Sequence, residues 1–270
     1  MRNWSIKNIE DRKYDFVPFS PRFADLFGKT EATGNWIVYG KSGQGKSSFC
    51  LQLAKEFDEI GKKVLFVSLE MGDSYDFQQA LANAGIRSGC SRISVTDSCH
   101  PEELKEELSK QRSADVIIID SLQYFIDLYR VRAADFIELR SKFKKKVFVY
   151  ISHMKGNDVD GDTAYDLKKD AFKRIHIEHF KASYVGRGNG GPKGFFVIWD
   201  KGYRQFWLEN GTKKETDGNN QENDTEWMIK KLHVLYARYG LSEEQYRALI
   251  LELTDGRTDT TKELTYAESQ

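Results

Sequence analysis

The sequence predicts an α/β fold, in which a central, mostly parallel sheet is flanked by helices, with a small helical hairpin near the C-terminal end. Short apolar runs rich in Val, Ile, Leu and aromatic residues recur along most of the chain, at Trp36–Tyr39, Val64–Leu69, Val116–Ile119, Val147–Ile151 and Phe195–Trp199. Helical patterns separate the early runs. Continuous apolar strands that alternate with helices are typical of a parallel sheet covered on both faces.

Two of the connecting segments carry clear helix signals. Residues 46–60 have apolar side chains at helical spacing, and Gly61 follows them as a residue that favours the turn ending a helix. Residues 101–108 open with a proline and carry acidic side chains in the first turn, where the helix dipole favours negative charge. Both segments are therefore predicted to link neighbouring strands.

The end of the chain differs in composition from the rest. Residues 211–224 contain no apolar side chain, which indicates a solvated linker. Beyond it, one helical pattern ends at Gly240, and Ser242 to Gln245 form a capping box for a second helix. We therefore expect a main domain over residues 1–210, a polar linker over 211–225, a helical hairpin over 226–254 and a flexible tail over 255–270. The hairpin could bind a partner protein, contact another copy of the chain, or pack on its own chain.

Composition excludes several classes of protein. The 270 residues include 41 Lys and Arg and 41 Asp and Glu, so the net charge does not by itself indicate a nucleic-acid partner. No apolar run is long enough to span a membrane and the N-terminus has no signal-peptide pattern, so we expect a cytoplasmic protein. Cys50, Cys90 and Cys99 include no Cys-x-x-Cys pair, which argues against a disulfide framework or a zinc site.

A glycine-rich loop after the first apolar run matches the Gly-x-x-x-x-Gly-Lys-Ser phosphate-binding pattern. Its glycines let successive backbone N–H groups converge on phosphate oxygens at a helix N-terminus. Lys46 is placed to reach the β- and γ-phosphates, and the Ser47 hydroxyl to ligate Mg²⁺. The alternative is a glycine-rich turn that matches by chance. The predicted residues for binding ATP are Gly40, Lys41, Ser42, Gly43, Gln44, Gly45, Lys46, Ser47 and Ser48.

Three later strands end in side chains suited to chemistry on a bound phosphate. Asp120 ends an apolar strand and is predicted to support the magnesium ion together with Ser47. Glu70 ends the strand after the phosphate-loop helix and is the predicted general base that polarises water. His153 follows a further strand and could contact the γ-phosphate. Alone, the same residues could be a turn aspartate, a helix-capping glutamate and a structural histidine.

The order of these motifs resembles that of RecA-like ATPases, most of all the DnaB-like replicative helicases and RadA-like recombination proteins. The resemblance covers roughly residues 36–207, and its more specific strings are Ser68-Leu69-Glu70-Met71 and Ile118 to Gln123. It implies Mg-dependent ATP hydrolysis with Glu70 activating water, Asp120 supporting the magnesium and His153 sensing the γ-phosphate. It also implies a homo-oligomer, either a ring or a filament. Only about 35 residues precede the first strand, so the chain resembles an isolated motor core.

In this family a lysine and an arginine from one subunit reach the nucleotide of its neighbour. Arg187 stands where the arginine would be, whereas Val185 occupies the lysine position. An arginine finger can raise the rate of phosphoryl transfer by orders of magnitude. The alternative is a glycine-rich hairpin that carries a solvated arginine.

The resemblance further implies DNA binding, to single-stranded rather than double-stranded DNA, through loops after the third and fourth strands. These would be Gln123–Ala134, with Tyr124, Tyr129, Arg130 and Arg132, and Met154–Arg174, with Lys155, Lys168, Lys169, Lys173 and Arg174. Basic side chains neutralise phosphates and aromatic side chains stack on bases. Five aspartates in the second loop leave its role open.

The sequence thus predicts a RecA-like ATPase that acts on DNA in replication or recombination, as a helicase or a recombinase. One alternative is an adaptor that binds ATP to change its assembly and turns over little. A small-molecule kinase is a further alternative, but no arginine-rich lid stands out, and a glutamate poised for water fits hydrolysis better.

Overall fold

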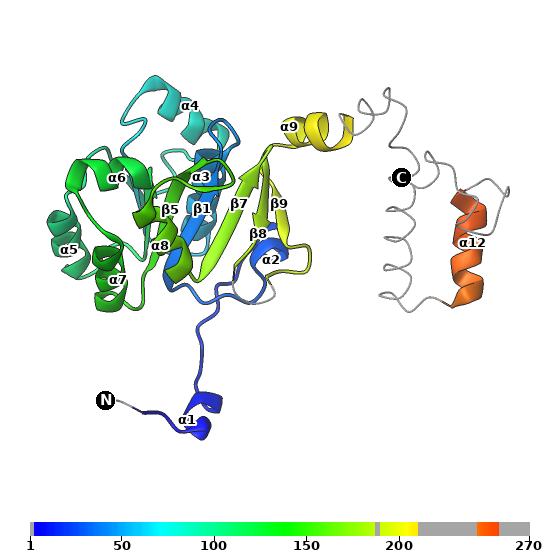
Figure 1. Cartoon of the computed structure of the whole chain (residues 1–270), viewed down its shortest axis with the longest axis horizontal. Coiled ribbons are helices and arrows are strands. Elements are labelled where there is room, and N and C mark those ends of the chain that lie inside the picture. The colour runs from blue at the N-terminus through cyan, green and yellow to red at the C-terminus, as the bar shows by residue number, and fades with distance from the viewer. Residues whose placement is uncertain (1–2, 187–189, 210–241, 254–270) are drawn as a thin grey trace. The chain divides into compact units, whose positions relative to one another are not determined.

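The computed structural model describes residues 3–186, 190–209 and 242–253. Contacts divide the chain into two compact units, Met1–Arg204 and Gln205–Gln270. The first unit contains the sheet and all the residues around the phosphate loop (Figure 1). In the second unit, the described elements are the short π-helix η1 (Gln205–Glu209) and α12 (Glu243–Leu253).

The described residues form a nine-stranded sheet in the order β3-β2-β4-β5-β1-β7-β8-β9, with β6 paired only to β5. The six strands from β3 to β7 in this order are parallel, and β8 and β9 add to the edge as antiparallel strands. The bounds are β1 Gly34–Gly40, β2 Val64–Ser68, β3 Ile93–Thr96, β4 Val116–Asp120, β5 Val147–Lys155, β6 Asp158–Val159, β7 Lys173–Glu178, β8 Lys181–Tyr184 and β9 Phe195–Val197. The predicted mostly parallel sheet is confirmed.

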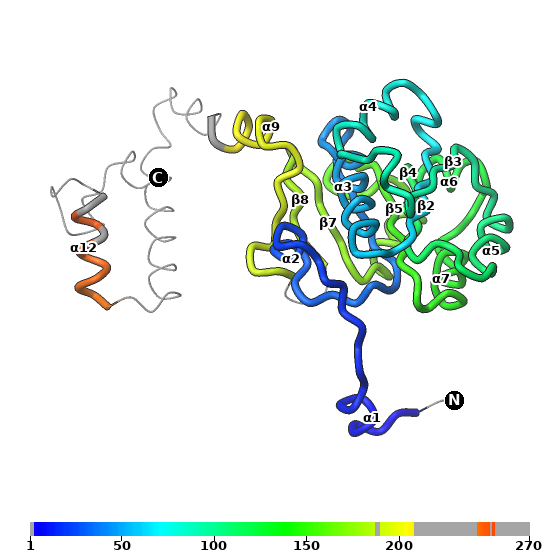
Figure 2. Tube along the Cα trace, turned by 180° about the vertical axis from the view of Figure 1, so that it is seen from behind, coloured from blue at the N-terminus to red at the C-terminus, as the bar shows by residue number. Residues whose placement is uncertain are grey.

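Helices cover both faces of this sheet (Figures 1 and 2). The face seen in Figure 2 packs against α2 (Pro21–Phe27), α3 (Lys46–Glu59) and α4 (Tyr75–Asn83). The opposite face packs against α5 (Pro101–Ser109), α6 (Leu122–Tyr129), α7 (Ala133–Lys142) and α8 (Asp162–Asp170). The short α1 (Ile6–Glu10) has no buried residue, and α9 (Asp200–Arg204) follows β9.

Each central strand supplies alternate side chains to two separate cores. In β1, Trp36 and Val38 enter the core beneath α3, while Ile37 and Tyr39 enter the core beneath α5–α8. All seven residues of this strand are buried, as expected for a parallel strand covered on both faces. Burial on both faces explains why these strands read as continuous apolar runs and not as alternating patterns.

The predicted helices match the structure closely, whereas β5 runs four residues beyond the predicted end at Ile151, to Lys155. Residues 46–60 form α3, residues 101–108 lie in α5, and Gly61 takes the expected left-handed conformation with φ of 83°. The capping box at Ser242 is present, since the Gln245 amide N–H donates to the Ser242 hydroxyl and the Ser242 N–H to the Gln245 side chain. The linker, the first helix of the predicted hairpin and the tail lie outside the described residues.

The two segments predicted to bind DNA were expected to be loops, and that expectation is wrong. Residues 123–134 lie mostly in α6 and the start of α7, and residues 154–174 contain the end of β5, β6, α8 and the start of β7. Strands β3, β6, β7 and β8 were not predicted from the sequence, because they are short or carry polar side chains. Residues 195–199 form only the three-residue edge strand β9. Among the described residues, no helix is long and apolar enough to cross a membrane.

Candidate active site

The carboxyl ends of four neighbouring strands meet at one edge of the sheet. Strand register pairs Ser68 with Asp120, Asp120 with Ile151, and Gly40 with His153. The phosphate loop, Glu70, Asp120 and His153 therefore leave the sheet at the same level. Parallel strand pairing brings Gly40, Asp120 and His153 to this level, and the turn after β2 places Glu70 beside them.

The phosphate loop connects β1 to α3 through glycines in unusual backbone conformations. Gly43 has φ of 72° and Gly45 has φ of 100°, a region that side-chain-bearing residues rarely adopt. Gly40 is needed for a different reason: a Cβ added there would lie 2.3 Å from the carbonyl oxygen of Ile177 on β7. The loop then enters α3 at Lys46, so the free N–H groups of the helix N-terminus face the edge where the strands end.

Lys46 is folded back onto this loop. Its Nζ donates a hydrogen bond to the Lys41 carbonyl oxygen at 3.0 Å, and the residue is buried. Burial lowers the pKa of Lys46, while the carboxylates of Glu70 and Asp120 act in the opposite direction. A cation that already lies over the loop can transfer its hydrogen bonds to phosphate oxygens at little conformational cost.

Asp120 is a buried carboxylate without a matching cation in direct contact. It is 1% exposed, and neither carboxylate oxygen has a well-aligned hydrogen-bond partner among the described residues. Burial raises the pKa of Asp120 to about 6; the nearby Ser47 hydroxyl lowers it in part, Glu70 raises it further, and Lys46 lowers it. Buried charges are normally paired or bound to metal, so an orphaned carboxylate beside a phosphate loop calls for a cation.

The residues around Asp120 fit a magnesium ion. Mg²⁺ is usually held by one or two protein oxygens together with water and substrate phosphates. Ser47 in the first turn of α3 and Asp120 at the end of β4 supply such oxygens on two sides of the same space. The described residues contain no cluster of three metal-binding side chains, so a cage made of protein ligands only is not present in that part of the chain.

Glu70 contacts His153, which lies two residues before the end of β5. Its Oε2 lies 3.3 Å from Nε2 of His153. The backbone N–H groups of Leu69 and Glu70 both donate to the carbonyl oxygen of Asp120, at 2.6 Å and 3.2 Å, which fixes the glutamate against β4. Glu70 does not cap the next helix, because Ser74 is the N-cap residue of α4. The capping alternative for Glu70 is therefore excluded.

Two contacts at the site were not predicted from the sequence. The side chain of Gln123, assigned to a DNA-binding loop, instead binds the end of β5 through Ser152 and the His153 N–H. The turn between β7 and β8 packs on the phosphate loop, where the N–H groups of His179 and Phe180 both donate to Gln44. His179 and Phe180 take positive φ values of 42° and 61°, which no local sequence signal announces.

The region predicted to act on a neighbouring subunit is only partly described. Arg187 lies outside the described residues. Strands β8 and β9, which precede and follow it in the sequence, pair as antiparallel neighbours. Val185 is 47% exposed and lines a groove of about 430 Å³ with Lys41 and Gln44 of the phosphate loop.

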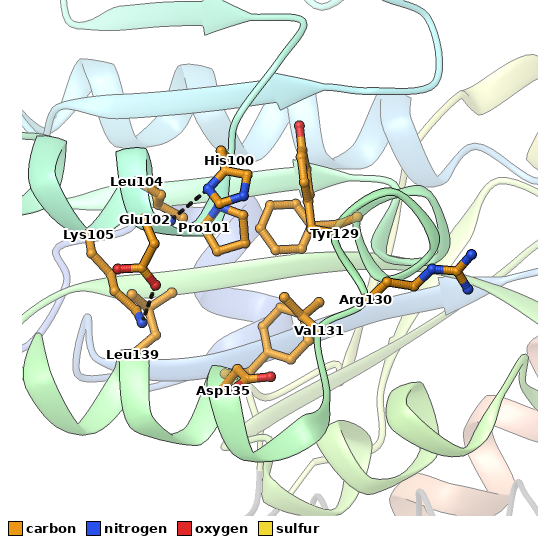
Figure 3. Close-up of a pocket in the computed structure, with 12 residues that line it drawn as sticks. His100, Pro101, Glu102, Leu104, Lys105, Tyr129, Arg130, Val131, Asp135 and Leu139 are labelled. Atoms are coloured by element: carbon orange, nitrogen blue, oxygen red, sulfur yellow. Dashed lines mark hydrogen bonds and ion pairs between the residues drawn. The ribbon is translucent and has the colours of Figure 1, made fainter.

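A separate hollow of about 210 Å³ lies between α5, α6 and α7 (Figure 3). Its wall combines apolar and aromatic side chains with a polar rim that includes His100, Tyr129 and Arg130. His100 caps α5 through Nδ1, which accepts the Glu102 N–H, and its ring meets that of Tyr129 edge to face at 5.3 Å. No residue of the phosphate loop lines this hollow.

Sequence comparisons find distant relatives among DNA repair proteins. The chain is 32% identical over 98 residues to DNA repair protein RadA of Chlamydia muridarum, covering 36% of this chain and 21% of that protein. It is 28% identical over 111 residues to DNA repair and recombination protein RadB of Methanosphaera stadtmanae, covering 38% of this chain and 47% of RadB. RadB of Methanococcoides burtonii is 26% identical over 166 residues, or 55% of this chain and 71% of that protein. The match thus spans less than half of the first two relatives.

Solved structures with a similar chain path include an ATP synthase subunit, NeqB, of Nanoarcheaum equitans, with a TM-score of 0.50 at 12% identity over 96% of this chain and 73% of that one. The flagellar accessory protein FlaH of Methanocaldococcus jannaschii has a TM-score of 0.48 at 18% identity, over 67% of this chain and 96% of that one. No known protein-family profile matches the chain. The sheet topology and the RadA and RadB relatives confirm the predicted RecA-like P-loop fold.

Proposed function

We propose that the chain hydrolyses ATP with Mg²⁺ and couples hydrolysis to the binding or remodelling of DNA in recombination or replication, as a homo-oligomer. The observation that carries this proposal is the orphaned buried carboxylate of Asp120, which lies beside Ser47 at the N-terminus of the phosphate-loop helix. The RadA and RadB relatives support a role in DNA repair and recombination.

The residues at the strand ends divide the work of hydrolysis. The loop N–H groups and Lys46 hold the β- and γ-phosphates, with Lys46 leaving the Lys41 carbonyl oxygen to do so. Ser47 and Asp120 would hold Mg²⁺, which when bound neutralises the charge that develops on the β- and γ-oxygens. These groups bring positive charge to the end of the substrate where the bond breaks.

Glu70 supplies the base in this mechanism. A water oxygen attacks the γ-phosphorus, the bond from that phosphorus to the β-bridging oxygen breaks, and the water proton passes to the Glu70 carboxylate. His153 Nε2, 3.3 Å from Glu70 Oε2, holds the carboxylate toward the phosphate loop. The products are ADP and inorganic phosphate.

The test is ATPase activity of the full chain with Mg²⁺, measured with and without single-stranded DNA. Glu70→Gln should abolish turnover and leave ATP binding intact, because the amide keeps the shape of the side chain and cannot accept the proton. Glu106→Gln is the matched control, since Glu106 is exposed on α5, a helix that contributes no residue to the site. Wild-type turnover in Glu70→Gln would refute the assignment of Glu70 as the base. An ATPase activity that does not change with any DNA would refute DNA as the partner.

DNA binding is proposed at the surface formed by α6 and the β5–β6 hairpin. Tyr124 on α6 and Lys155 at the end of β5 are exposed there. Lys168 is less suited, because its Nζ pairs with Asp158 at 2.6 Å. Anisotropy of a labelled single strand should fall for Tyr124→Ala and Lys155→Ala, and should change little for Lys168→Ala. Equal loss in all three variants would contradict this surface.

A nucleotide-controlled adaptor is the second candidate, and Val185 favours it. The exposed Val185 stands where the resemblance places a lysine that reaches the neighbouring nucleotide. Loss of that cation would slow hydrolysis without affecting binding by the phosphate loop. Oligomer size that follows ATP concentration, while turnover stays at background with every DNA tested, would establish the adaptor.

A further inference from the structure

Gln123 is the second residue of α6 and stands three positions after Asp120. Its side-chain amide reaches across to the end of β5. Oε1 accepts the backbone N–H of His153 at 3.0 Å, while Nε2 donates to the Ser152 hydroxyl at 2.9 Å and to the Asp160 carbonyl oxygen at 3.0 Å. One side chain thus joins α6 to residues on both sides of the β5–β6 hairpin.

The orientation of this amide is determined by its partners. The His153 N–H can only donate and the Asp160 carbonyl can only accept, so exchanging the oxygen and nitrogen of Gln123 would leave two mismatched contacts. No other common side chain of similar size offers an acceptor and two donors in this arrangement. Glutamate keeps only the acceptor, and leucine keeps neither.

The contacts of Gln123 lie at the base of the hairpin. The hairpin pairs Met154 with Val159 and Lys155 with Asp158, and the Asp160 N–H donates to the His153 carbonyl oxygen at 2.9 Å. Gln123 forms hydrogen bonds to both His153 and Asp160, and so links the two residues at the base of the hairpin from the side of α6. Any shift of His153 must therefore move Asp160 or break a hydrogen bond to Gln123.

His153 is also the residue of the hairpin base that contacts the proposed catalytic base. Its Nε2 lies 3.3 Å from Glu70 Oε2, whereas its backbone N–H is held by Gln123. Glu70, His153, Gln123 and Asp160 form a continuous series of polar contacts from the turn after β2 to the hairpin. His153, Gln123 and Asp160 are partly buried, and hydrogen bonds in such a site are costly to leave unpaired, so displacement at one end favours displacement at the other.

We infer that Gln123 is a positioning residue that sets the His153 imidazole against Glu70 and transmits the arrival or loss of the γ-phosphate to the β5–β6 hairpin. This inference rests on the proposed ATPase function. When a γ-phosphate binds, Glu70 and His153 change partners, His153 shifts, and Gln123 moves the base of the hairpin with it. The hairpin is on the surface proposed above for DNA, so the same series would make that surface responsive to the nucleotide.

Three variants separate the parts of this role. Gln123→Leu removes the acceptor and both donors. Gln123→Glu keeps the acceptor for the His153 N–H and loses the donors to Ser152 and Asp160. Gln79→Leu is the control, because it replaces glutamine by leucine at an exposed site on α4. Binding of a non-hydrolysable ATP analogue, ATPase kinetics, and hydrogen exchange of the amides of residues 154–159 with and without the analogue are measured for each full-length protein.

In the wild type and in Gln79→Leu, the analogue should change exchange in residues 154–159. In Gln123→Leu the analogue should bind with unchanged affinity, kcat should fall by about tenfold or more because the Glu70–His153 pair is misplaced, and the exchange response should disappear. In Gln123→Glu most of kcat should remain, because the His153 N–H keeps its acceptor, while the exchange response is lost. This split between catalysis and response is not expected of a merely structural residue.

Several outcomes would overturn the inference. An exchange response in Gln123→Leu equal to that of the wild type would show that the signal takes another route. Equal loss of kcat, affinity and thermal stability in Gln123→Leu and Gln123→Glu would show a structural role only. If the wild-type protein bound the analogue without any change in hydrogen exchange of residues 154–159, the hairpin would not respond to the nucleotide, and the inference would be refuted. A wild-type protein that binds no nucleotide would instead refute the proposed function itself.

Discussion

His153 Nε2 lies 3.3 Å from Glu70 Oε2, although His153 is on β5 and Glu70 follows β2, and β4 separates these two strands in the sheet. Glu70 follows β2 by two residues and reaches over the end of β4, where its N–H is held by the Asp120 carbonyl oxygen. The contact therefore depends on the turn after β2 and not on strand pairing. It joins the proposed base directly to the proposed sensor.

Removal of the histidine should impair catalysis more than binding. His153→Ala leaves the Glu70 carboxylate without its contact at Oε2, so the carboxylate is less well oriented toward water. We expect kcat to fall about tenfold or more with little change in the affinity for an ATP analogue. Glu106→Ala, at an exposed position of α5, is the control. A variant with normal kcat and weakened ATP binding would instead place His153 in substrate binding.

Asp120 should destabilise the protein in the absence of nucleotide and metal. Its folded-state pKa is raised from 3.8 to about 6. A carboxyl group with a raised folded-state pKa favours the folded state while it is protonated, and that contribution is lost as pH rises from about 4 to 6. At neutral pH the buried charge costs on the order of 3 kcal/mol.

Asp120→Asn should therefore be more stable than the wild type at neutral pH in the absence of nucleotide and metal. The gain in unfolding free energy should shrink between pH 6 and pH 4, and Mg-dependent ATP hydrolysis should be lost. Urea unfolding at several pH values measures the first effect, with Asp127→Asn on the exposed face of α6 as the control. An asparagine variant that is less stable at neutral pH would mean that the carboxylate is already compensated in the folded chain.

Lys46→Met should abolish phosphate binding without unfolding the protein. The side chain is buried and its cation contacts only the Lys41 carbonyl among the hydrogen bonds described, so an apolar replacement of similar length fits the same space. Loss of the cation should lower kcat/KM for ATP by a factor of about 100 or more, as for other preorganised donors to a developing negative charge. Lys55→Met on the same helix is the control. Unchanged ATP affinity in Lys46→Met would contradict the assigned role of the loop.

The sequence predicted the parts of this site that depend on strand ends. The apolar runs stop at Gly40, at Asp120 and just before Ser152 and His153, and parallel pairing then places Gly40, Asp120 and His153 at the same edge of the sheet. Gln123 could not be placed in the same way, because its partners lie in a hairpin whose two-residue strand β6 has no apolar pattern. The contact of His179 and Phe180 with Gln44 depends on two residues with positive φ, which the sequence does not mark with glycine.

The Gly40 position offers a test of close packing between β1 and β7. A Cβ at residue 40 would lie 2.3 Å from the Ile177 carbonyl oxygen, and this neighbour is backbone in a paired strand, so it cannot turn aside as a side chain could. We expect Gly40→Ala to lower the free energy of unfolding by at least roughly 1–3 kcal/mol, the usual cost of overpacking. Gly89→Ala is the matched control, because a Cβ there meets no atom within 4 Å and its φ is not in the left-handed region. Urea unfolding of both variants measures the difference. If Gly40→Ala were as stable as Gly89→Ala, the two strands could separate at the phosphate loop at no cost, and the loop would not be held rigidly against β7.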